Sequence, residues 1–439
     1  MGKMTVEGRK HLKILVIWKL LTVGGVNAGW RNRAIHFSKS NVTTDFLYLH
    51  DKGGLHMLQD VARVYLTRDP NQIIKILKKN KYDLIVVVDS SEVYPLIKKA
   101  KFNGKLIVEA RSPNKEKIAP HLQDFKGLNP DAIVVPSIFQ KRVVSSILNK
   151  RVPIRIVYNP IDTDCFKPIP SGRDMDRAGA ILPQNQKIIG WIGRLDVRKN
   201  WRFLLEIARH IIQIRKDVQF WVIGGKASRE REIFSKQIKE YKLKDYIRWF
   251  PVVPYQMMPE FYSQIADSGG CTLSTTLMES FGNTFIESMA CGCPVVAPGI
   301  SSLPEIIEHD RTGKLYRPAS LMKALKHLNN MLDHHQLREE IRKNALKEVK
   351  ARFAIEVCAE QYLQIIRDMV PESIATDDKV LQANDFQVQP ELMVEPYKHI
   401  AWPTGQIQSQ QAPIIRNTFH RIEKRLGRTE LFHSKRNFL

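Results

Sequence analysis

The chain has 439 residues, of which 43% are hydrophobic and 26% charged, and its formal net charge is +23. This length exceeds what one ordinary core supports, so we expect two domains of about 170 to 200 residues each. No apolar run reaches the roughly 18 residues that a membrane-spanning helix needs, and residues 1–10 lack the apolar part of a signal peptide. Five scattered cysteines exclude a disulfide scaffold, and a cytoplasmic protein is predicted.

The positive charge is concentrated in the first two-fifths of the chain. Residues 1–170 contain 29 Lys and Arg against 14 Asp and Glu, which leaves +15. A field of this sign attracts anionic partners, namely phospholipid surfaces, pyrophosphate-linked lipids, acidic polysaccharides or nucleic acid. A charged surface that only keeps the protein in solution is the alternative.

The first part of the chain alternates short apolar runs with helical patterns. A buried strand is expected at 12–18, followed by Gly24 and Gly25 in a loop and a helix that begins near Trp30. Further strands are expected at 46–49, 84–88, 106–109, 132–135 and 154–157, with helices such as 71–79 and 139–148 between them. This alternation predicts a parallel, doubly wound α/β sheet.

A turn-rich stretch at 162–185 predicts a domain boundary, and the alternation then resumes. Strands are expected at 187–192, 219–223, 247–250, 271–275 and 295–297, and helices at 201–214, 229–241, 259–264, 285–289, 303–307 and 321–349. We therefore predict Rossmann-like domains at 1–165 and 166–350, a helix at 351–370, and a linker with a basic tail at 371–439. Apolar spacing in the tail suits either an amphipathic helix on a membrane surface or a solvated segment.

The most informative motif runs from Glu279 to Glu287 and leads through an apolar helix to the strand 294–297. A strand, a glycine-containing turn, a helix and a strand follow one another, and such a unit offers a helix N-terminus to an anion. Backbone N–H groups from Phe281 to Thr284 would point at a phosphate, and Glu287 could accept hydrogen bonds from sugar hydroxyls. The spacing alone is weak, because paired glutamates arise by chance and a glycine before a helix is ordinarily a turn.

Three ordered blocks of sequence resemble the retaining GT-B glycosyltransferases of family 4, the glycosyl transferases group 1. The donor block holds Glu279, Phe281, Gly282 and Glu287 and continues through 289–292, 294–296, 303–307 and 312–315; the other blocks are 188–195 with Lys199, and 157–166. The resemblance spans roughly residues 130 to 370. It implies two Rossmann-like domains that face each other across a ligand-binding cleft, with the helix 351–370 crossing back to the first.

The resemblance also implies roles for individual residues. A nucleotide sugar releases a diphosphate, whose negative charge Arg194 and Lys199 would stabilise without a metal. Glu279 would lie near the transferred sugar, and Glu287 would hold the ribose hydroxyls. The other donor-binding candidates belong to two glycine-containing loops and the start of the donor helix: Gly24, Gly25, Gly193, Ser280, Phe281, Gly282, Asn283 and Thr284.

Two positions depart from the family pattern. Most relatives have a small apolar residue at position 283, where this chain has an Asn that could contact the sugar or the phosphate. Many relatives have a His against the transferred sugar, and here Arg111 stands in that catalytic position with Glu109 nearby. Either the site recognises something anionic through Arg111, or the correspondence is shifted by a residue or two.

The resemblance implies a reaction that retains the configuration of the transferred sugar. The donor is a nucleotide sugar, which is a substrate, so no separate cofactor and no metal are expected. The acceptor is predicted to be a glycan, a lipid-linked glycan or another anionic molecule. Two Asp-x-Asp motifs, at 162–164 and 174–176, look like metal–diphosphate signatures, but we interpret both as structural.

Two other classes of protein compete with a glycosyltransferase. One is a catalytically inactive module of the same fold that only binds sugar nucleotides; the joint presence of both predicted cations and both glutamates disfavours it. The other is a basic nucleic-acid-binding protein, which is less favoured because no basic motif is interleaved with aromatic residues. Peripheral contact with an anionic membrane is compatible with the charge, and no nucleic-acid partner is predicted.

Overall fold

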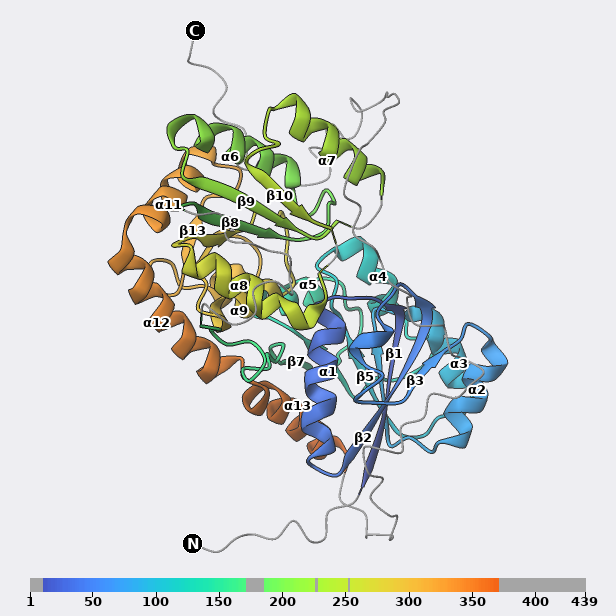
Figure 1. Cartoon of the computed structure of the whole chain (residues 1–439). Coiled ribbons are helices and arrows are strands. Elements are labelled where there is room, and N and C mark those ends of the chain that lie inside the picture. The colour runs from blue at the N-terminus through green and yellow to red at the C-terminus, as the bar shows by residue number, and fades with distance from the viewer. Residues whose placement is uncertain (1–10, 171–184, 226–227, 252, 371–439) are drawn as a thin grey trace, which may run out of the picture. The chain divides into compact units, whose positions relative to one another are not determined.

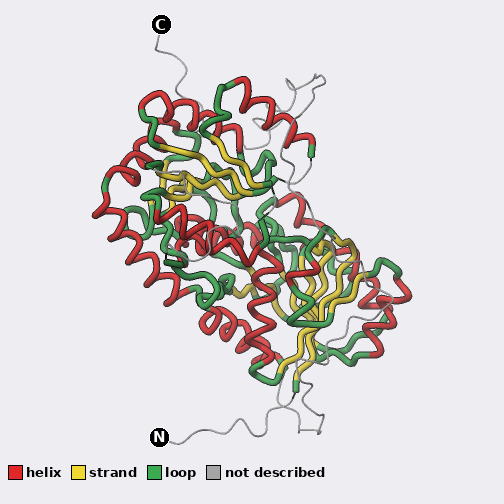
Figure 2. Tube along the Cα trace, viewed as in Figure 1, coloured by secondary structure: helices red, strands yellow, loops and turns green. Residues whose placement is uncertain are grey.

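The computed structural model describes residues 11–170, 185–225, 228–251 and 253–370. Within them the chain forms two parallel β-sheets flanked by helices (Figure 1, Figure 2). The first sheet has the order β3-β2-β1-β4-β5-β6-β7, with β1 (Leu12–Leu21), β2 (Val42–Asp51), β3 (Val64–Leu66), β4 (Leu84–Val88), β5 (Lys105–Glu109), β6 (Ala132–Val135) and β7 (Ile154–Ile156). Its helices are α1 (Gly25–Ser38), α2 (Pro70–Lys79), α3 (Tyr94–Lys99), α4 (Lys115–Gln123) and α5 (Ile138–Ser145).

The central strands of this sheet are apolar on both faces. All five residues of β4 are buried, which is typical of a parallel strand with helices on each side. Its side chains alternate between two cores, since Val86 joins the core that contains α1 while Ile85 and Val87 join the opposite one. The predicted doubly wound sheet is therefore confirmed, and its continuous apolar run explains why this strand was visible in the sequence.

The second sheet has the order β10-β9-β8-β11-β12-β13. Its strands are β8 (Lys187–Ile192), β9 (Val218–Ile223), β10 (Ile247–Phe250), β11 (Cys271–Leu273), β12 (Val295–Pro298) and β13 (Lys314–Tyr316). Its helices are α6 (Trp201–Ile214), α7 (Arg229–Glu240), α8 (Met258–Asp267), α9 (Asn283–Ala290), α10 (Leu303–Ile306), α11 (Leu321–Asp333) and α12 (His335–Arg352).

Both sheets contain a point at which the strand order reverses. In the first sheet it lies between β1 and β4, and in the second between β8 and β11. In open parallel sheets, ligands bind outside the carboxyl ends of the strands at such a point. The loops that follow β1, β8 and β11 are therefore the parts of the fold best placed to form a site, and they contain most of the residues singled out in the sequence.

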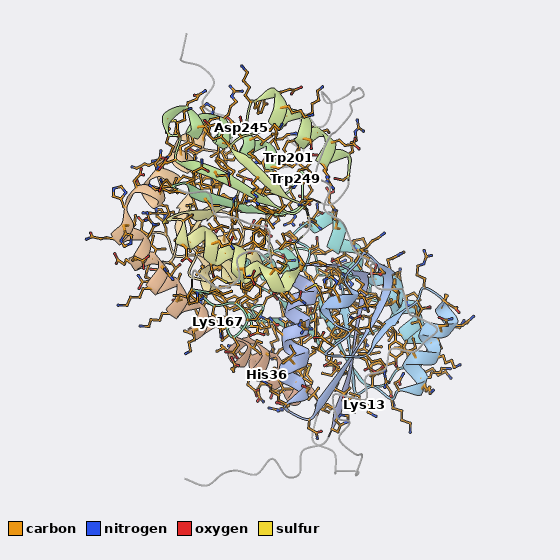
Figure 3. The ribbon with its side chains drawn as sticks, viewed as in Figure 1. Lys13, His36, Lys167, Trp201, Asp245 and Trp249 are labelled. Carbon is orange, nitrogen blue, oxygen red and sulfur yellow. The ribbon has the colours of Figure 1, made fainter. Side chains whose placement is uncertain are left out.

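The last described helix, α13 (Ile355–Met369), packs against α1 (Figure 1). The ring centroids of Tyr362 on α13 and Trp30 on α1 are 5.4 Å apart, and both side chains are buried in the core of the first sheet. On the outer side, His36 of α1 lies 2.9 Å from Glu360 of α13 (His36 is labelled in Figure 3). A segment from the end of the described chain thus completes the core of the first sheet.

Some elements differ from the sequence-based expectation. The predicted single helix at 321–349 is two helices, because His334 between them has an extended backbone with φ −104° and ψ 93°. Strands β3 and β13 were missed, since three residues carry too little alternation to stand out. Helix α1 begins at Gly25 and not near Trp30, because it buries polar residues such as Asn27 and therefore lacks a clear apolar stripe.

Three predicted features lie outside the described residues: the segment 371–439, most of the turn-rich boundary, and the Asp-x-Asp motif at 174–176. The described part of the chain contains no helix that is both long and apolar enough to cross a membrane.

Candidate active site

Gly282 and Ser302 fix the turn that precedes the N-terminus of α9. Gly282 is the residue that caps α9, and its φ of 113° lies in the region that favours glycine. A Cβ at this position would lie 2.6 Å from the Phe285 ring. The hydroxyl of Ser302 contacts the carbonyl oxygens of Glu279 and Phe281 at 3.1 and 2.8 Å, which fixes the turn. The first N–H groups of α9 lack partners within the helix and are suited to an anion.

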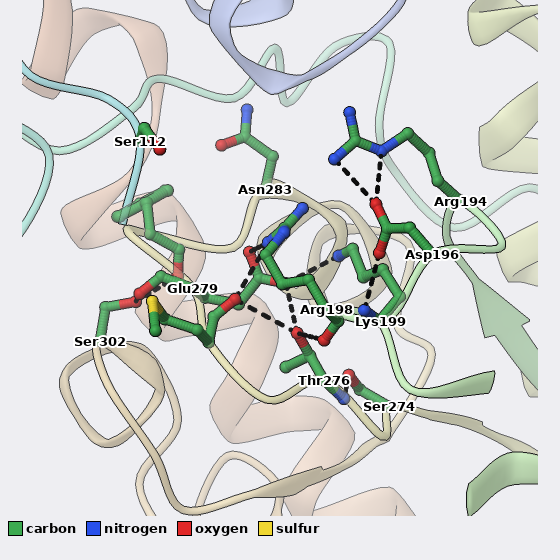
Figure 4. Close-up of polar contacts among 12 residues, drawn as sticks. Ser112, Arg194, Asp196, Arg198, Lys199, Ser274, Thr276, Glu279, Asn283 and Ser302 are labelled. Carbon is green, nitrogen blue, oxygen red and sulfur yellow. Dashed lines mark hydrogen bonds and ion pairs between the residues drawn. The ribbon is translucent and has the colours of Figure 1, made fainter. Parts of the chain in front are cut away.

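Glu279, at the end of the loop after β11, is held by two cations (Figure 4). Lys199 Nζ lies 2.7 Å from one carboxylate oxygen and Arg198 Nη1 lies 2.9 Å from the other. Thr276 donates a further hydrogen bond of 3.0 Å. Burial raises the pKa of Glu279, but the two cations and the hydrogen bonds outweigh it, so the pKa lies below its ordinary value. The carboxylate is therefore ionised at neutral pH.

Arg198 was not singled out in the sequence, although it is adjacent to Lys199. Both lie in the loop that follows β8. This loop contacts the loop that follows β11, where the hydroxyl of Thr276 meets the carbonyl oxygen of Arg198. Arg198 also donates to the carbonyl of Met278 at 3.0 Å. The signal that could have identified Arg198 is the Arg-Lys pair itself, but a basic pair in a loop is ordinarily solvated.

Arg194 lies further out than the other two cations. Its side chain is 72% exposed, and its guanidinium lies 3.0 Å from the Asp196 carboxylate. The second carboxylate oxygen of Asp196 accepts the backbone N–H of Lys199 at 2.9 Å, so Asp196 lies between the two predicted cations (Figure 4). Gly193 directly precedes this loop, and its N–H donates to the end of β9 at 3.0 Å. The predicted pair is thus on one loop, with Lys199 inside and Arg194 at the surface.

Glu287 lies one turn inside α9 and is buried. Tyr262 of α8, a residue not predicted from the sequence, donates a hydrogen bond of 3.1 Å to its carboxylate. Burial raises the pKa of Glu287 to about 7, although the hydrogen bond from Tyr262 and the charge of Lys199 act in the opposite direction. Close to neutral pH this carboxyl group is therefore partly protonated, unlike that of Glu279.

The other residues predicted at the start of α9 have different surroundings. Ser280 accepts a 2.6 Å hydrogen bond from the hydroxyl of Ser137 through its carbonyl oxygen. The Phe281 ring is buried and stacks on Tyr158 with centroids 5.8 Å apart, so its side chain is part of the core. Thr284 occupies the second position of α9 and is half-buried. Gly282 to Thr284 therefore remain the backbone of the predicted anion site.

The fold brings the glycine pair of the first sheet to Asn283. Gly24 caps α1, and its carbonyl oxygen accepts the N–H of Ala28 at 3.0 Å. The carbonyl oxygen of Gly25 accepts a hydrogen bond of 3.2 Å from the side-chain amide of Asn283. A Cβ at Gly25 would lie 2.9 Å from the Asn283 side chain, so a larger residue at position 25 would displace the Asn283 amide. Two candidates far apart in sequence are thus direct neighbours.

Arg111 was predicted in a catalytic position, but its guanidinium is engaged inside the first domain. It forms two hydrogen bonds with Glu109, of 2.6 and 2.7 Å, and one of 2.8 Å with Asn159. The side chain is only 4% exposed. Burial raises the pKa of Glu109, but the charge of Arg111 and its hydrogen bonds lower it below the ordinary value. Each side chain therefore compensates the charge of the other, and Arg111 directs its guanidinium at Glu109 and Asn159.

The described residues give no group of three or more His, Cys, Asp or Glu side chains placed to hold a metal ion. In the Asp-x-Asp motif at 162–164, the Asp162 carboxylate accepts the backbone N–H groups of Asp164 and Cys165, both at 3.0 Å. This geometry is a turn at the start of the inter-domain segment.

Comparison with known proteins finds a family likeness over the residues of this site. Residues 173–348, which include both loops and α9, match the family model described as glycosyl transferases group 1. This match covers less than half of the chain, and it shows a likeness to this family over those residues. The chain is 34% identical over 164 residues to sucrose synthase 1 of Zea mays, which covers 35% of this chain and 20% of that protein. It is 23% identical over 308 residues to spore coat protein SA of Bacillus subtilis (strain 168), which covers 66% of this chain and 79% of that protein.

Solved structures show the same fold. Anabaena Alr3699/HepE in complex with UDP and glucose matches with a TM-score of 0.70 at 17% identity, over 82% of this chain and 100% of that chain. With the two parallel sheets, this likeness confirms the predicted GT-B fold. The chain spans only 17% to 26% of the length of the sucrose synthases that it matches.

Proposed function

We propose that the protein is a glycosyltransferase that moves a sugar from a nucleotide-sugar donor to a glycan or lipid-linked acceptor. The observation that carries the proposal is the convergence of Lys199 and Arg198 on Glu279 beside the N-terminus of α9. Cations, a carboxylate and a helix N-terminus at the carboxyl ends of β8 and β11 are what a sugar diphosphate requires. The Anabaena neighbour is in complex with UDP and glucose, so a UDP-sugar is the first donor to test.

In the proposed reaction the bond between the anomeric carbon and the phosphate oxygen breaks, and its electron pair leaves with the diphosphate. Lys199, Arg198 and the surface residue Arg194 would stabilise that charge, because preorganised donors in a partly buried site need no reorganisation. The acceptor hydroxyl forms the new bond from the same face of the sugar and passes its proton to the departing phosphate. Retention of configuration, independence from metals and a ribose contact from Glu287 are part of the proposal.

The acceptor and the cellular location belong to the proposal as well. The excess of +15 in residues 1–170 favours an acceptor that carries phosphate or carboxylate, or one embedded in an anionic membrane. We propose a cytoplasmic protein that touches such a membrane peripherally. Co-sedimentation with vesicles that contain anionic lipid, absent with neutral vesicles and reversed by salt, is the expected result.

The activity is tested by thermal shift and hydrolysis with a panel of UDP-, GDP-, ADP- and CMP-sugars. One of them should stabilise the fold by about 2.7 kcal/mol at a hundredfold excess over Kd, and should be turned over. Lys199→Ala should lose turnover, whereas the exposed control Lys343→Ala should keep it. Binding without turnover would identify the inactive sugar-nucleotide module, and no stabilisation by any donor would refute the proposal.

A further inference from the structure

A continuous chain of hydrogen bonds runs from the core of the first domain to the start of α9. Glu109 binds Arg111 at 2.6 and 2.7 Å, and Arg111 Nη1 donates to Asn159 Oδ1 at 2.8 Å. Asn159 Nδ2 donates to Asn283 Oδ1 at 2.8 Å, and Asn283 Nδ2 donates to the Gly25 carbonyl at 3.2 Å. Arg111 and Asn283, the two departures from the family pattern, are thus joined through one side chain.

The direction of this chain is set by its first members. A guanidinium has only donors, so the side chain of Asn159 must turn its oxygen toward Arg111 and its NH₂ group toward Asn283. The side chain of Asn283 must then present its oxygen to Asn159 and its NH₂ group to Gly25. Rotating either amide by half a turn would bring two oxygens or two NH₂ groups together. The orientation of both amides is therefore fixed from two ends, by the donors of Arg111 and by the carbonyl oxygen of Gly25.

One of the two N–H donors of the Asn283 side chain is not used in this chain of hydrogen bonds, and it lies near the start of α9. Its NH₂ group carries two protons, and the bond to Gly25 uses one of them. Asn283 is also the first residue of α9, directly after Gly282, and is half-buried. The second proton therefore lies beside the helix N-terminus at which a donor phosphate or its sugar would bind.

We propose that Asn283 is a specificity-determining residue for the donor, and that Arg111 is a positioning residue that acts on Asn283 through Asn159. The inference rests on the proposed glycosyltransferase function. Arg111 does not bind an anionic sugar itself, since Glu109 already neutralises it and it is almost fully buried. Its effect on the reaction is to fix which atom of Asn283 faces the donor.

Asn159→Asp is the sharpest test, because it is isosteric and keeps an oxygen for Arg111. The variant lacks the NH₂ group that Asn159 offers to Asn283. The new carboxylate keeps its contact with Arg111 but leaves Asn283 with no orientation that satisfies both neighbours, because the Asn283 oxygen then meets an oxygen of that carboxylate or, if the amide turns, the Gly25 carbonyl oxygen. We expect kcat/KM for the best UDP-sugar to fall about tenfold, with a changed preference among UDP-sugars and an unchanged or higher Tm. The exposed control Asn103→Asp should alter neither.

A double-mutant cycle with Asn283→Ala decides whether the effect is transmitted. In the Ala background Asn159→Asp should have no further effect on kcat/KM, because no amide is left to turn. A loss of the same factor in both backgrounds, or a loss of Tm that accounts for the loss of activity, would overturn the relay. If the unmodified protein neither binds nor turns over any nucleotide sugar, the proposed function itself fails; if it does both and the cycle is multiplicative, only the relay fails.

Discussion

The buried carboxyl of Glu287 makes stability depend on pH, and Glu287→Gln isolates that dependence. An unfolded glutamate loses its proton near pH 4.5, whereas burial lets the folded protein keep it up to about pH 7. Between these two values the folded state binds more protons than the unfolded state. The free energy of unfolding therefore falls as the pH rises through this window, and the full stability is present only below it.

The size of the effect follows from the separation of the two pKa values. A raised pKa of about 7 against an ordinary 4.5 corresponds to about 3 kcal/mol, at roughly 1.4 kcal/mol per pH unit. Gln fills the same space, carries no proton to lose and keeps a partner for the Tyr262 hydroxyl. The variant should therefore gain about 2 to 3 kcal/mol relative to the unmodified protein between pH 5 and pH 8.

Urea unfolding at pH 5 and pH 8 measures this difference. The comparison between variant and unmodified protein at each pH cancels the titration of histidines and other groups common to both. Glu206→Gln, on the exposed face of α6, is the matched control and should give the same small difference at both pH values. An equal difference for Glu287→Gln at both pH values would refute the assignment of a raised pKa to this group.

Three further predictions concern the loops around the site. Lys199→Ala removes one cation from Glu279 while Arg198 remains, so kcat should fall about 10²- to 10³-fold, with the fold intact by circular dichroism. An unchanged kcat would show that Lys199 has no part in the mechanism. Glu305 accepts the first two N–H groups of α5, both at 2.7 Å, so Glu305→Gln should lower the free energy of unfolding by about 1 to 2 kcal/mol, and an unshifted urea midpoint would contradict this. Gly282→Ala places a Cβ against the Phe285 ring at a positive φ, so it should cost at least about 1 to 2 kcal/mol in the same assay; equal stability would show that the turn relaxes freely.

The sequence was sufficient to locate a helix or strand where the local pattern of residues and the tertiary packing favour the same element. The strand at 84–88 is an uninterrupted apolar run, and the helix at 201–214 has a clear apolar stripe, so both were located to the residue. The break at His334 was invisible, because helix-forming residues continue on both sides and only the packing of α11 on α12 requires it. Composition and periodicity carry no information about such a turn.

The candidate site likewise contains residues that could be singled out from the sequence and residues that could not. Glu279, Lys199 and Glu287 were singled out because they lie in or next to the sequence blocks that resemble a known family, and the structure brings Lys199 to Glu279. Arg198 and Tyr262 were missed, because their roles depend on how separate loops and helices meet in space. The environment of Arg111 was likewise beyond prediction, since its partner Asn159 lies 48 residues further along the chain.

The packing of α13 on α1 has a consequence for how the protein can be made and divided. The core of the first sheet includes Tyr362, Leu363 and Ile366, so it stays incomplete during synthesis until nearly all described residues have been translated. Until then α1 exposes the apolar side that surrounds Trp30, a surface that attracts chaperones or promotes aggregation. A fragment that ends before residue 355 should be poorly soluble. Adding α13 as a separate peptide should restore the solubility of that fragment. The two sheets are successive in sequence, but the core of the first sheet depends on a helix that follows the second sheet.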